Sequence, residues 1–262
     1  SEMCIRDSPN DATYGGNTDN EYTQKFGKQQ GKYYVPQRAA AGLDPWATPQ
    51  AYDNAKDFFD TGITWSNSLN VAQMLDKSSY SISLGNTHQD GIISSTGMDR
   101  YNVKVSADTK LTNNWSSGFT ANYITTSIDK AVTSGNGLLR TVYAAPPSYD
   151  LAGIPSHVDG NPYTQNSFRG SFDNAYWAME NNKFTEDTNR FFGNVYASYQ
   201  TDFGTTNHKL NAKYMVGVDA YTTHYVDSYG YGSNTGGGRG QIENYGWTNA
   251  TYNSLLTINY DW

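Results

Sequence analysis

The chain has 262 residues, a length that suits one large β-domain or two ordinary domains. Charged residues make up 16%, well below the roughly 25% of ordinary soluble domains, and aromatic residues reach 15%. The net charge of −7 argues against a nucleic-acid partner, because phosphate binding needs clustered Lys and Arg. No apolar run approaches the roughly 18 residues of a membrane-spanning helix, which excludes a helical membrane protein. A transmembrane β-barrel stays open, because its strands alternate apolar and polar side chains.

The first eight residues differ in character from the rest of the chain. Residues 1–8 resemble translated sequencing-adapter read-through, so we interpret them as an artefact and leave them out of the fold prediction. They contain Cys4, the only cysteine. The remaining sequence therefore allows an oxidising compartment without requiring one.

Seven segments alternate apolar and polar side chains with the period of a β-strand. The clearest is 208–224, where Leu210 and Tyr214 share one face while Lys209 and Lys213 share the other. No segment places a charge on its apolar face, and we predict no amphipathic helix. The predicted strands are 61–71, 78–86, 99–110, 115–126, 188–203, 208–224 and 247–260.

Strand length and loop length favour a barrel over a soluble β-sandwich, which also buries one face of each sheet. Several segments run well beyond the usual five or six residues, and about 9–11 residues suffice to cross a bilayer. Short and long connections alternate, as in outer-membrane barrels with short periplasmic turns and long extracellular loops. The short links are 72–77, 111–114 and 204–207, and the long links are 87–98, 127–187, 225–246 and the stretch before residue 57.

We therefore predict an all-β fold, a fragment of an antiparallel transmembrane β-barrel with about seven strands and long extracellular loops. The sequence ends inside the last predicted strand, and an open sheet in a bilayer would leave backbone groups unsatisfied at its edges. We accordingly expect the barrel to be truncated. The predicted organisation is an artefact at 1–8, an extracellular loop region at 9–56 and a partial barrel at 57–262.

Six short motifs follow one another in the predicted barrel. They are DFFDTGITWSNSL at 57–69, YSISLG at 80–85, QDGII at 89–93, DRYNV at 99–103, NNKFT at 181–185 and NRFFGNV at 189–195. No single motif is specific. Over about 57–203, their order and spacing resemble the early barrel of SusC/RagA-type TonB-dependent transporters.

The resemblance implies a barrel of about 22 strands in the cell outer membrane, with a lumen closed by an N-terminal plug. It also implies contact with outer-membrane lipid and a SusD-like surface lipoprotein that acts as a lid. Such transporters import oligosaccharides or oligopeptides with energy delivered through TonB. The chain lacks the plug and the TonB-contacting segment, so we expect no transport from this part alone. The substrate class stays open.

The sequence offers no catalytic constellation, so we predict no enzyme activity, catalytic residue, metal or cofactor. His88, His157, His208 and His224 lack metal-ligand spacing, and no G-x-S-x-G elbow is present. Two rival functions remain. One is a soluble or surface-attached β-sandwich that recognises glycans, and the other is an outer-membrane barrel hydrolase with its catalytic set outside this sequence.

Two groups of residues are candidates for functional contacts. The long link 127–187 is rich in aromatic side chains, whose flat apolar faces and polar groups suit sugar rings or peptide side chains. They also fit a second interpretation, in which they form the loop's own small core. The predicted substrate or lid contacts are Tyr143, Tyr149, Tyr163, Tyr176 and Trp177. The charged residues predicted to face the lumen or the plug are Lys104, Asp108, Lys209, Lys213 and Asp219.

Overall fold

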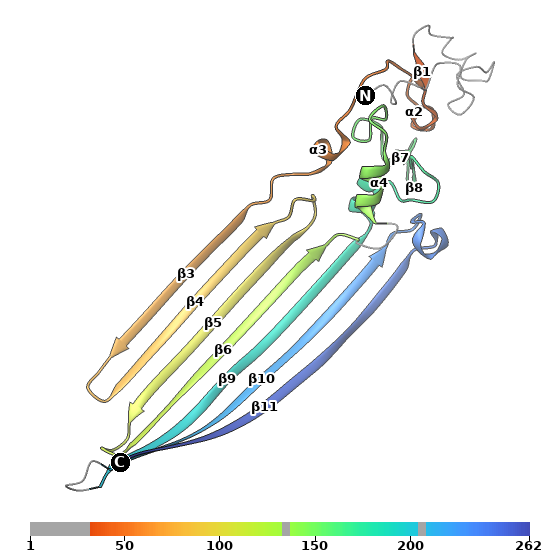
Figure 1. The fold of residues 1–262 in the computed structure, drawn as a ribbon. Helices are drawn as coiled ribbons and strands as arrows, with labels where there is room; N and C mark the ends of the chain where they lie inside the picture. Colours follow the sequence, from red (N-terminus) through yellow and green to blue (C-terminus); the bar gives the residue numbers. More distant parts are fainter. Residues whose placement is uncertain (1–31, 133–136, 204–207) are drawn as a thin grey trace.

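The computed structural model describes residues 32–132, 137–203 and 208–262. The predicted artefact at 1–8 and the predicted short link 204–207 lie outside the described residues. The described chain forms one large antiparallel sheet and a smaller region of short helices and strands at one end of it (Figure 1).

Seven long strands form the sheet in chain order, and every neighbouring pair is antiparallel. They are β3 (Thr64–Met74), β4 (Ser78–Asp90), β5 (Gly97–Lys110), β6 (Trp115–Lys130), β9 (Lys183–Asp202), β10 (Lys209–Tyr229) and β11 (Gln241–Asp261). The prediction of an antiparallel β fold with seven long strands is confirmed. In the described residues the sheet is open, with β3 and β11 as its edges.

The strands extend further toward the helical region than the sequence predicts. The predicted long link 87–98 is wrong, because β4 and β5 continue until only residues 91–96 connect them. The added end of β4 carries polar side chains on both faces and is joined to β5 by polar cross-strand contacts, such as the 2.7 Å contact between the His88 ring and Asp99. Similar polar pairs join β6 to β9 and β9 to β10. Cross-strand hydrogen bonding therefore prolongs the ladder where the apolar alternation stops.

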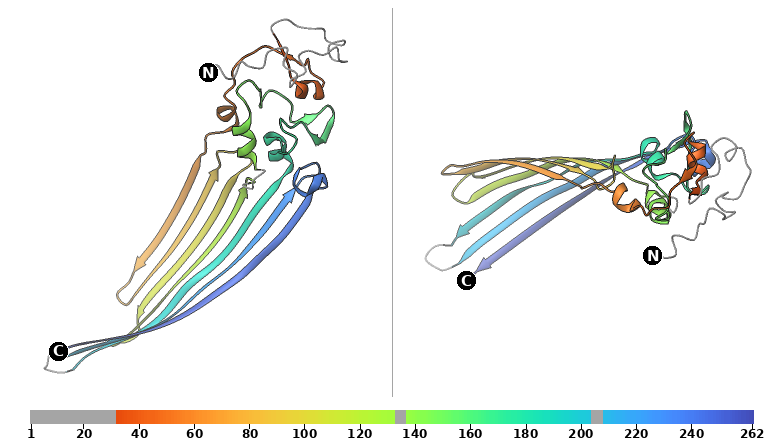
Figure 2. Two further views of the ribbon diagram at one scale, coloured as in Figure 1. Left: turned by 45° about the vertical axis from the view of Figure 1, so that its right-hand side comes forward. Right: turned by 90° about the horizontal axis from the view of Figure 1, so that it is seen from above.

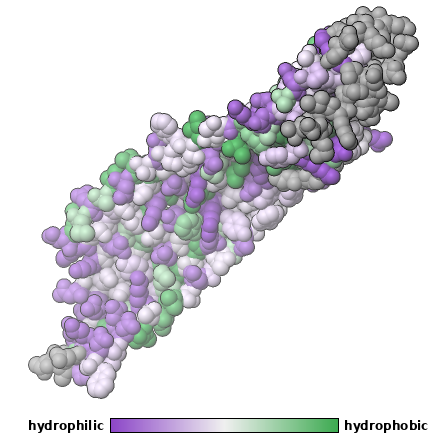
Figure 3. Space-filling view, turned by 45° about the horizontal axis from the view of Figure 1, so that its top comes forward, coloured by the Kyte–Doolittle hydropathy of each residue, from purple (hydrophilic) through white to green (hydrophobic). Residues whose placement is uncertain are grey.

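The strand register gathers the apolar side chains of the sheet on one face. We call this surface the apolar band, and its large side chains are exposed to solvent in the described structure. Its large members include Leu69, Val71, Ile82, Leu84, Val103, Phe119, Tyr123, Phe191, Val195, Tyr214, Val216, Tyr252, Leu256 and Ile258. Figure 3 shows both kinds of side chain at the surface of the strands, with hydrophobic patches in green among hydrophilic side chains in purple.

The smaller region, which we call the cap, comprises the described residues of 33–60, 137–182 and 230–240. It lies beyond one end of the strands, which bend along their length (Figure 2). Its elements are β1 (Tyr33–Tyr34), α2 (Pro36–Ala40), β2 (Trp46–Ala47), α3 (Asn54–Phe58), α4 (Leu138–Ala144), β7 (His157–Val158), β8 (Asn161–Gln165), α5 (Ala175–Asn181) and the 3-10 helix η3 (Thr235–Gly238). The predicted loop region 9–56 thus contributes ordered elements to the cap.

The cap helices were not predicted because each is short. The longest, α4 and α5, have seven residues, about two turns, which is too short for a clear amphipathic period. Local capping sets the start of α5, where the Asn174 side chain accepts hydrogen bonds from the backbone of Tyr176 at 2.9 Å and of Trp177 at 3.2 Å. None of the described helices is long and apolar enough to span a membrane.

Candidate functional site

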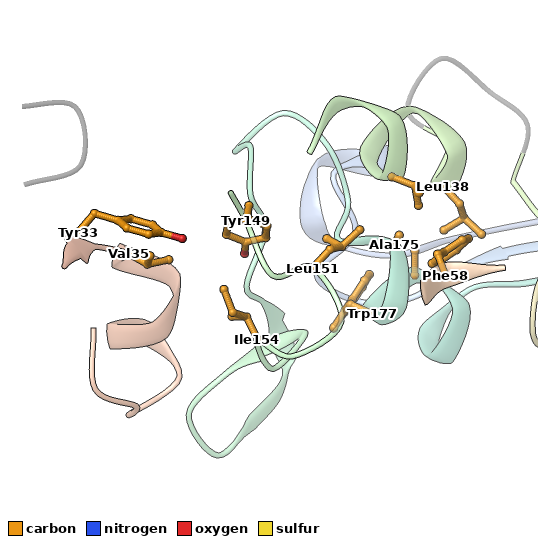
Figure 4. Packing of buried hydrophobic residues seen from close by; sticks show 11 residues of the cluster. Tyr33, Val35, Phe58, Leu138, Tyr149, Leu151, Ile154, Ala175 and Trp177 are labelled. Carbon is orange, nitrogen blue, oxygen red and sulfur yellow. The ribbon is translucent and has the colours of Figure 1, made fainter. Parts of the chain in front are cut away.

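The cap has its own hydrophobic core, drawn from segments far apart in the sequence. Trp177 of α5 lies at its centre with 1% of its surface exposed, close to Leu151 and Ala175 (Figure 4). The indole Nε1 of Trp177 donates a hydrogen bond of 2.8 Å to the carbonyl of Pro162. Phe58 of α3 and Leu138 of α4 complete the side of the core that faces the sheet. Packing of α3, α4 and α5 therefore joins the N-terminal segment to the long loop.

Tyr149 belongs to the same core, with its ring 4.9 Å from that of Phe168. Its hydroxyl is buried and has no hydrogen-bond partner among the described residues. Burial, aided by the neighbouring carboxylate of Asp150, raises the pKa of Tyr149 well above its usual value. A buried polar group without a partner costs free energy, so the Tyr149 hydroxyl destabilises the cap.

Replacing Tyr149 with Phe is therefore expected to stabilise the cap by about 1 kcal/mol. Because the pKa of Tyr149 is raised in the folded state, ionisation of Tyr149 leaves the stability of the cap unchanged below about pH 10 and lowers it as the pH rises further. The Phe variant should lack this alkaline loss. Hydrogen exchange of the cap at pH 8 and pH 11 tests both effects, and equal alkaline loss in both proteins would contradict the prediction.

The other predicted contact residues are more exposed. Tyr176 is half-buried, with its ring 5.3 Å from Phe58 and its hydroxyl donating to the Asp57 carbonyl at 3.3 Å. Burial raises the pKa of Tyr176, and nearby carboxylates add to the effect. Tyr143 and Tyr163 keep 69% and 58% of their surfaces exposed.

The five predicted contact residues thus fall into two groups. Tyr149 and Trp177 form the loop's own core, as the second interpretation proposed, and have almost no surface with which to contact a ligand. It stays a prediction that Tyr143, Tyr163 and Tyr176 contact a substrate or a lid protein.

The five predicted lumen residues all lie on the sheet face opposite the apolar band. We call this surface the polar face. The structure brings Asp108 and Lys213 together around Tyr196, which sequence reasoning missed. The Tyr196 hydroxyl donates to Asp108 at 2.5 Å, and the Lys213 Nζ lies 4.0 Å from the centre of the Tyr196 ring. Gly118 of β6 is paired with Asp108 on one side and with Tyr196 on the other, and a Cβ at Gly118 would be 2.3 Å from the Asp108 carboxylate.

Asp219 is paired on the same face with a residue that the sequence did not single out. Arg190 of β9 donates through Nε to Asp219 at 2.8 Å and makes a second bond through its other guanidinium nitrogen. A two-point Arg–carboxylate contact fixes both side chains against the sheet. No comparable partner is recorded for Lys104 or Lys209 among the described residues.

Aromatic side chains also gather on the polar face at its cap end, near a groove of about 850 Å³ whose lining includes Lys130, Phe184 and Tyr245. The rings of Tyr225 and Tyr245 stack with centres 5.0 Å apart, and Trp247 lies 5.1 Å from Tyr225. Lys130 lies over Tyr225 and pairs with Glu186 at 3.2 Å. The sequence prediction placed Tyr225 and Tyr245 in the long link 225–246, whereas they lie in β10 and β11, so it missed this cluster.

A second depression, which we call the cap pocket, lies within the cap and has a volume of about 530 Å³. Its walls come from α2, β8 and the connection between β10 and β11. Beneath it, the buried carboxylate of Asp173 accepts hydrogen bonds from the Ser233 hydroxyl at 2.6 Å, the Asn234 backbone at 2.7 Å and the Gln165 amide at 2.7 Å. These contacts hold three separate chain segments in one arrangement.

The described residues contain no group of three or more His, Cys, Asp or Glu side chains that could hold a metal ion. A scan against protein-family models gives no match for this chain, and a search of the curated proteins gives none.

Proposed function

We propose that the seven-stranded sheet is part of a transmembrane β-barrel in the outer membrane. The apolar band faces lipid, the polar face lines the lumen, and the cap lies on the extracellular side. The observation that carries this proposal is the apolar band itself, because a monomeric soluble protein rarely exposes so large a continuous apolar surface. A sandwich would need a second sheet over the band, and the other described sheets are two-stranded pairs in the cap.

The band runs obliquely across the strands, as expected if they tilt relative to a membrane plane. Leu69 on β3 and Ala220 on β10 lie in one row of the register. On β3 the apolar residues continue from that row toward the cap as far as Trp65. On β10 they continue from the same row away from the cap as far as Leu210. Ten residue steps along β10 span about 34 Å, which a tilt of about 40° reduces to about 26 Å. That height matches the roughly 25 Å apolar band of outer-membrane barrels.

Aromatic side chains lie at both borders of the band, where barrels carry interfacial girdles. The residues at the cap-side border are Trp65, Tyr101, Tyr123 and Phe191, and those at the opposite border are Tyr80, Trp115, Tyr199 and Tyr260. Trp115 and Tyr199 contact each other with ring centres 5.0 Å apart. Beyond the cap-side border the same face turns polar, which suits strand ends that project from the membrane.

The motifs at 57–203 support a more specific proposal, an importer of the SusC/RagA type. Such a protein would take up oligosaccharides or oligopeptides with energy delivered through TonB, with a SusD-like lipoprotein seated over the cap. The exposed cap side chains Tyr143 and Tyr163 are candidates for contact with substrate or lid.

Tryptophan fluorescence in lipid vesicles tests the membrane proposal. Variants of the intact protein that keep one Trp each, at Trp65, Trp115, Trp247 or Trp177, are folded into vesicles whose acyl chains carry bromine, a quencher. We expect strong quenching at Trp65 and Trp115, which border the band, and weak quenching at Trp247 on the polar face and Trp177 in the cap core. Equal quenching at all four positions would contradict the assignment of the faces. An intact protein that is stable and monomeric in plain buffer would favour the sandwich.

A further inference from the structure

We infer that the cap pocket binds a neutral sugar unit of an oligosaccharide, so that the cargo of this importer is a glycan. The inference rests on the proposed function, because the cap is an extracellular surface only if the sheet spans the outer membrane. It concerns the cap pocket alone and is independent of the groove on the polar face.

The cap pocket is formed by tertiary structure and does not lie within one loop. Three distant parts of the chain contribute to its lining. They supply Gln37 from α2, Tyr163 from β8 and Asn234, the residue that precedes η3. Gly232 is essential to their approach: its φ is +100°, and a Cβ there would lie 2.0 Å from the Tyr163 carbonyl. Only a residue without a side chain lets the β10–β11 connection pack so closely on β8.

The pocket floor is held rigid by hydrogen bonds. Besides its contact with Asp173, the Gln165 amide donates to the Gly232 carbonyl at 2.8 Å, and its carbonyl accepts from the Asn174 backbone at 2.7 Å. The Asn166 amide, which is almost fully buried, donates to the carbonyls of Gln37 at 2.7 Å and Pro155 at 3.1 Å. A site whose polar groups are fixed in advance loses little entropy on binding.

The chemistry of the walls selects an uncharged, hydroxyl-rich ligand. No described residue that lines the pocket carries a charge, and seven of the eleven lining residues carry an amide or hydroxyl group. Amides both donate and accept hydrogen bonds, which matches the dual character of sugar hydroxyls. The Asn234 side chain has no recorded partner within the described residues, and that of Gln37 has one weak contact of 3.5 Å. An oligopeptide would call for apolar side-chain pockets or charged groups for its termini, which the lining does not offer.

The rim supplies the flat apolar surface that a sugar ring needs. Tyr163 lines the pocket, and its ring meets Tyr231 edge to face, with centres 6.1 Å apart and planes at 82°. Both side chains remain more than half exposed, at 58% and 63%. A tyrosine ring can pack against the C–H face of a sugar while its hydroxyl stays hydrated. The volume of about 530 Å³ lies in the usual range for small-ligand sites.

Binding calorimetry on the intact protein in detergent tests the inference. The probes are neutral tetrasaccharides derived from α-glucan, β-glucan, mannan and xylan, with uncharged, end-blocked tetrapeptides as the competing class. We expect at least one tetrasaccharide to bind and no tetrapeptide to do so. Asn234→Ala and Tyr163→Ala should each weaken that binding by about tenfold, the loss of one good contact. The matched control Gln50→Ala removes an exposed cap amide outside the pocket and should change binding less than twofold.

The outcomes separate this inference from the membrane proposal. Three outcomes would overturn the inference. The first is that no sugar binds, and the second is that sugar binds equally well to both pocket variants. The third is that a peptide binds and Asn234→Ala removes that binding. Protease resistance of the cap in each variant shows whether it has kept its fold, and Tyr163→Phe, which keeps the ring, should bind nearly as well as the unchanged protein. Weak quenching of Trp65 and Trp115 in brominated lipid would instead defeat the barrel and leave the pocket result standing.

Discussion

Replacing Trp177 with alanine is expected to unfold the cap while the seven-stranded sheet keeps its ladder. The indole is 1% exposed, belongs to the hydrophobic core of the cap, and donates a hydrogen bond to the Pro162 carbonyl. Removing a buried Trp side chain costs roughly 3–5 kcal/mol, because the lost burial is joined by a cavity that the surroundings fill only in part. The described segments contribute eleven buried hydrophobic residues to this core, and a core of that size has little stability to spare.

Hydrogen exchange read by mass spectrometry distinguishes loss of the cap from global unfolding. Peptides from 137–182 should exchange much faster in the variant, whereas peptides from β4, β5 and β9 should keep their protection. Leu139→Ala is the matched control, since Leu139 lies on α4 with 43% of its surface exposed. Unchanged protection of 137–182 in the Trp177 variant would show that the cap does not depend on this core.

Replacing Val195 with arginine is expected to prevent stable insertion of the protein into lipid. Val195 lies on β9, an interior strand of the sheet, is 53% exposed, and lies in the middle of the apolar band between Phe119 and Val216. An arginine facing lipid at the bilayer midplane costs about 2–4 kcal/mol. Asn194→Arg is the matched control, because it places the same charge one residue away on the polar face, where water can solvate it.

The depth dependence of this cost identifies lipid as the surrounding medium. On the same face of β9, arginine at Thr201 and at Asn189 lies near the two borders of the band and should cost about 0–1 kcal/mol. Folding yield into phospholipid vesicles, measured for all four variants, gives the profile. A cost at Asn194 equal to that at Val195 would contradict the two-faced barrel.

Much of the strand architecture could be predicted because period-2 alternation reports which side chains share a face. The sequence indicated all seven strands, their chain order and the opposition of Lys209 and Lys213 to Leu210 and Tyr214, and the register agrees. It underestimated strand length at the cap end. At the cap end of β4 polar residues occupy both faces, so alternation carries no signal, and cross-strand pairs such as His88 with Asp99 continue the ladder.

Site residues were predicted less completely, because aromatic composition does not reveal burial. Tyr149 and Tyr163 are equivalent in the sequence, yet one is a core residue and the other lies at a pocket rim. The Asp108–Tyr196–Lys213 contact depends on strand register across Gly118, and no local pattern in the sequence reports it.

The sequence by itself therefore determined the antiparallel strands, their two faces and the alternation between tight turns and long connections at β6–β9 and β10–β11. Those properties follow from local periodicity and turn chemistry, which a short window of residues contains. Only the tertiary structure decided that 33–60, 137–182 and 230–240 pack into one cap and that Gln37, Tyr163 and Asn234 meet at a pocket. Such contacts arise when segments far apart along the chain bury apolar surface together, and the free energy that selects them belongs to the assembled core.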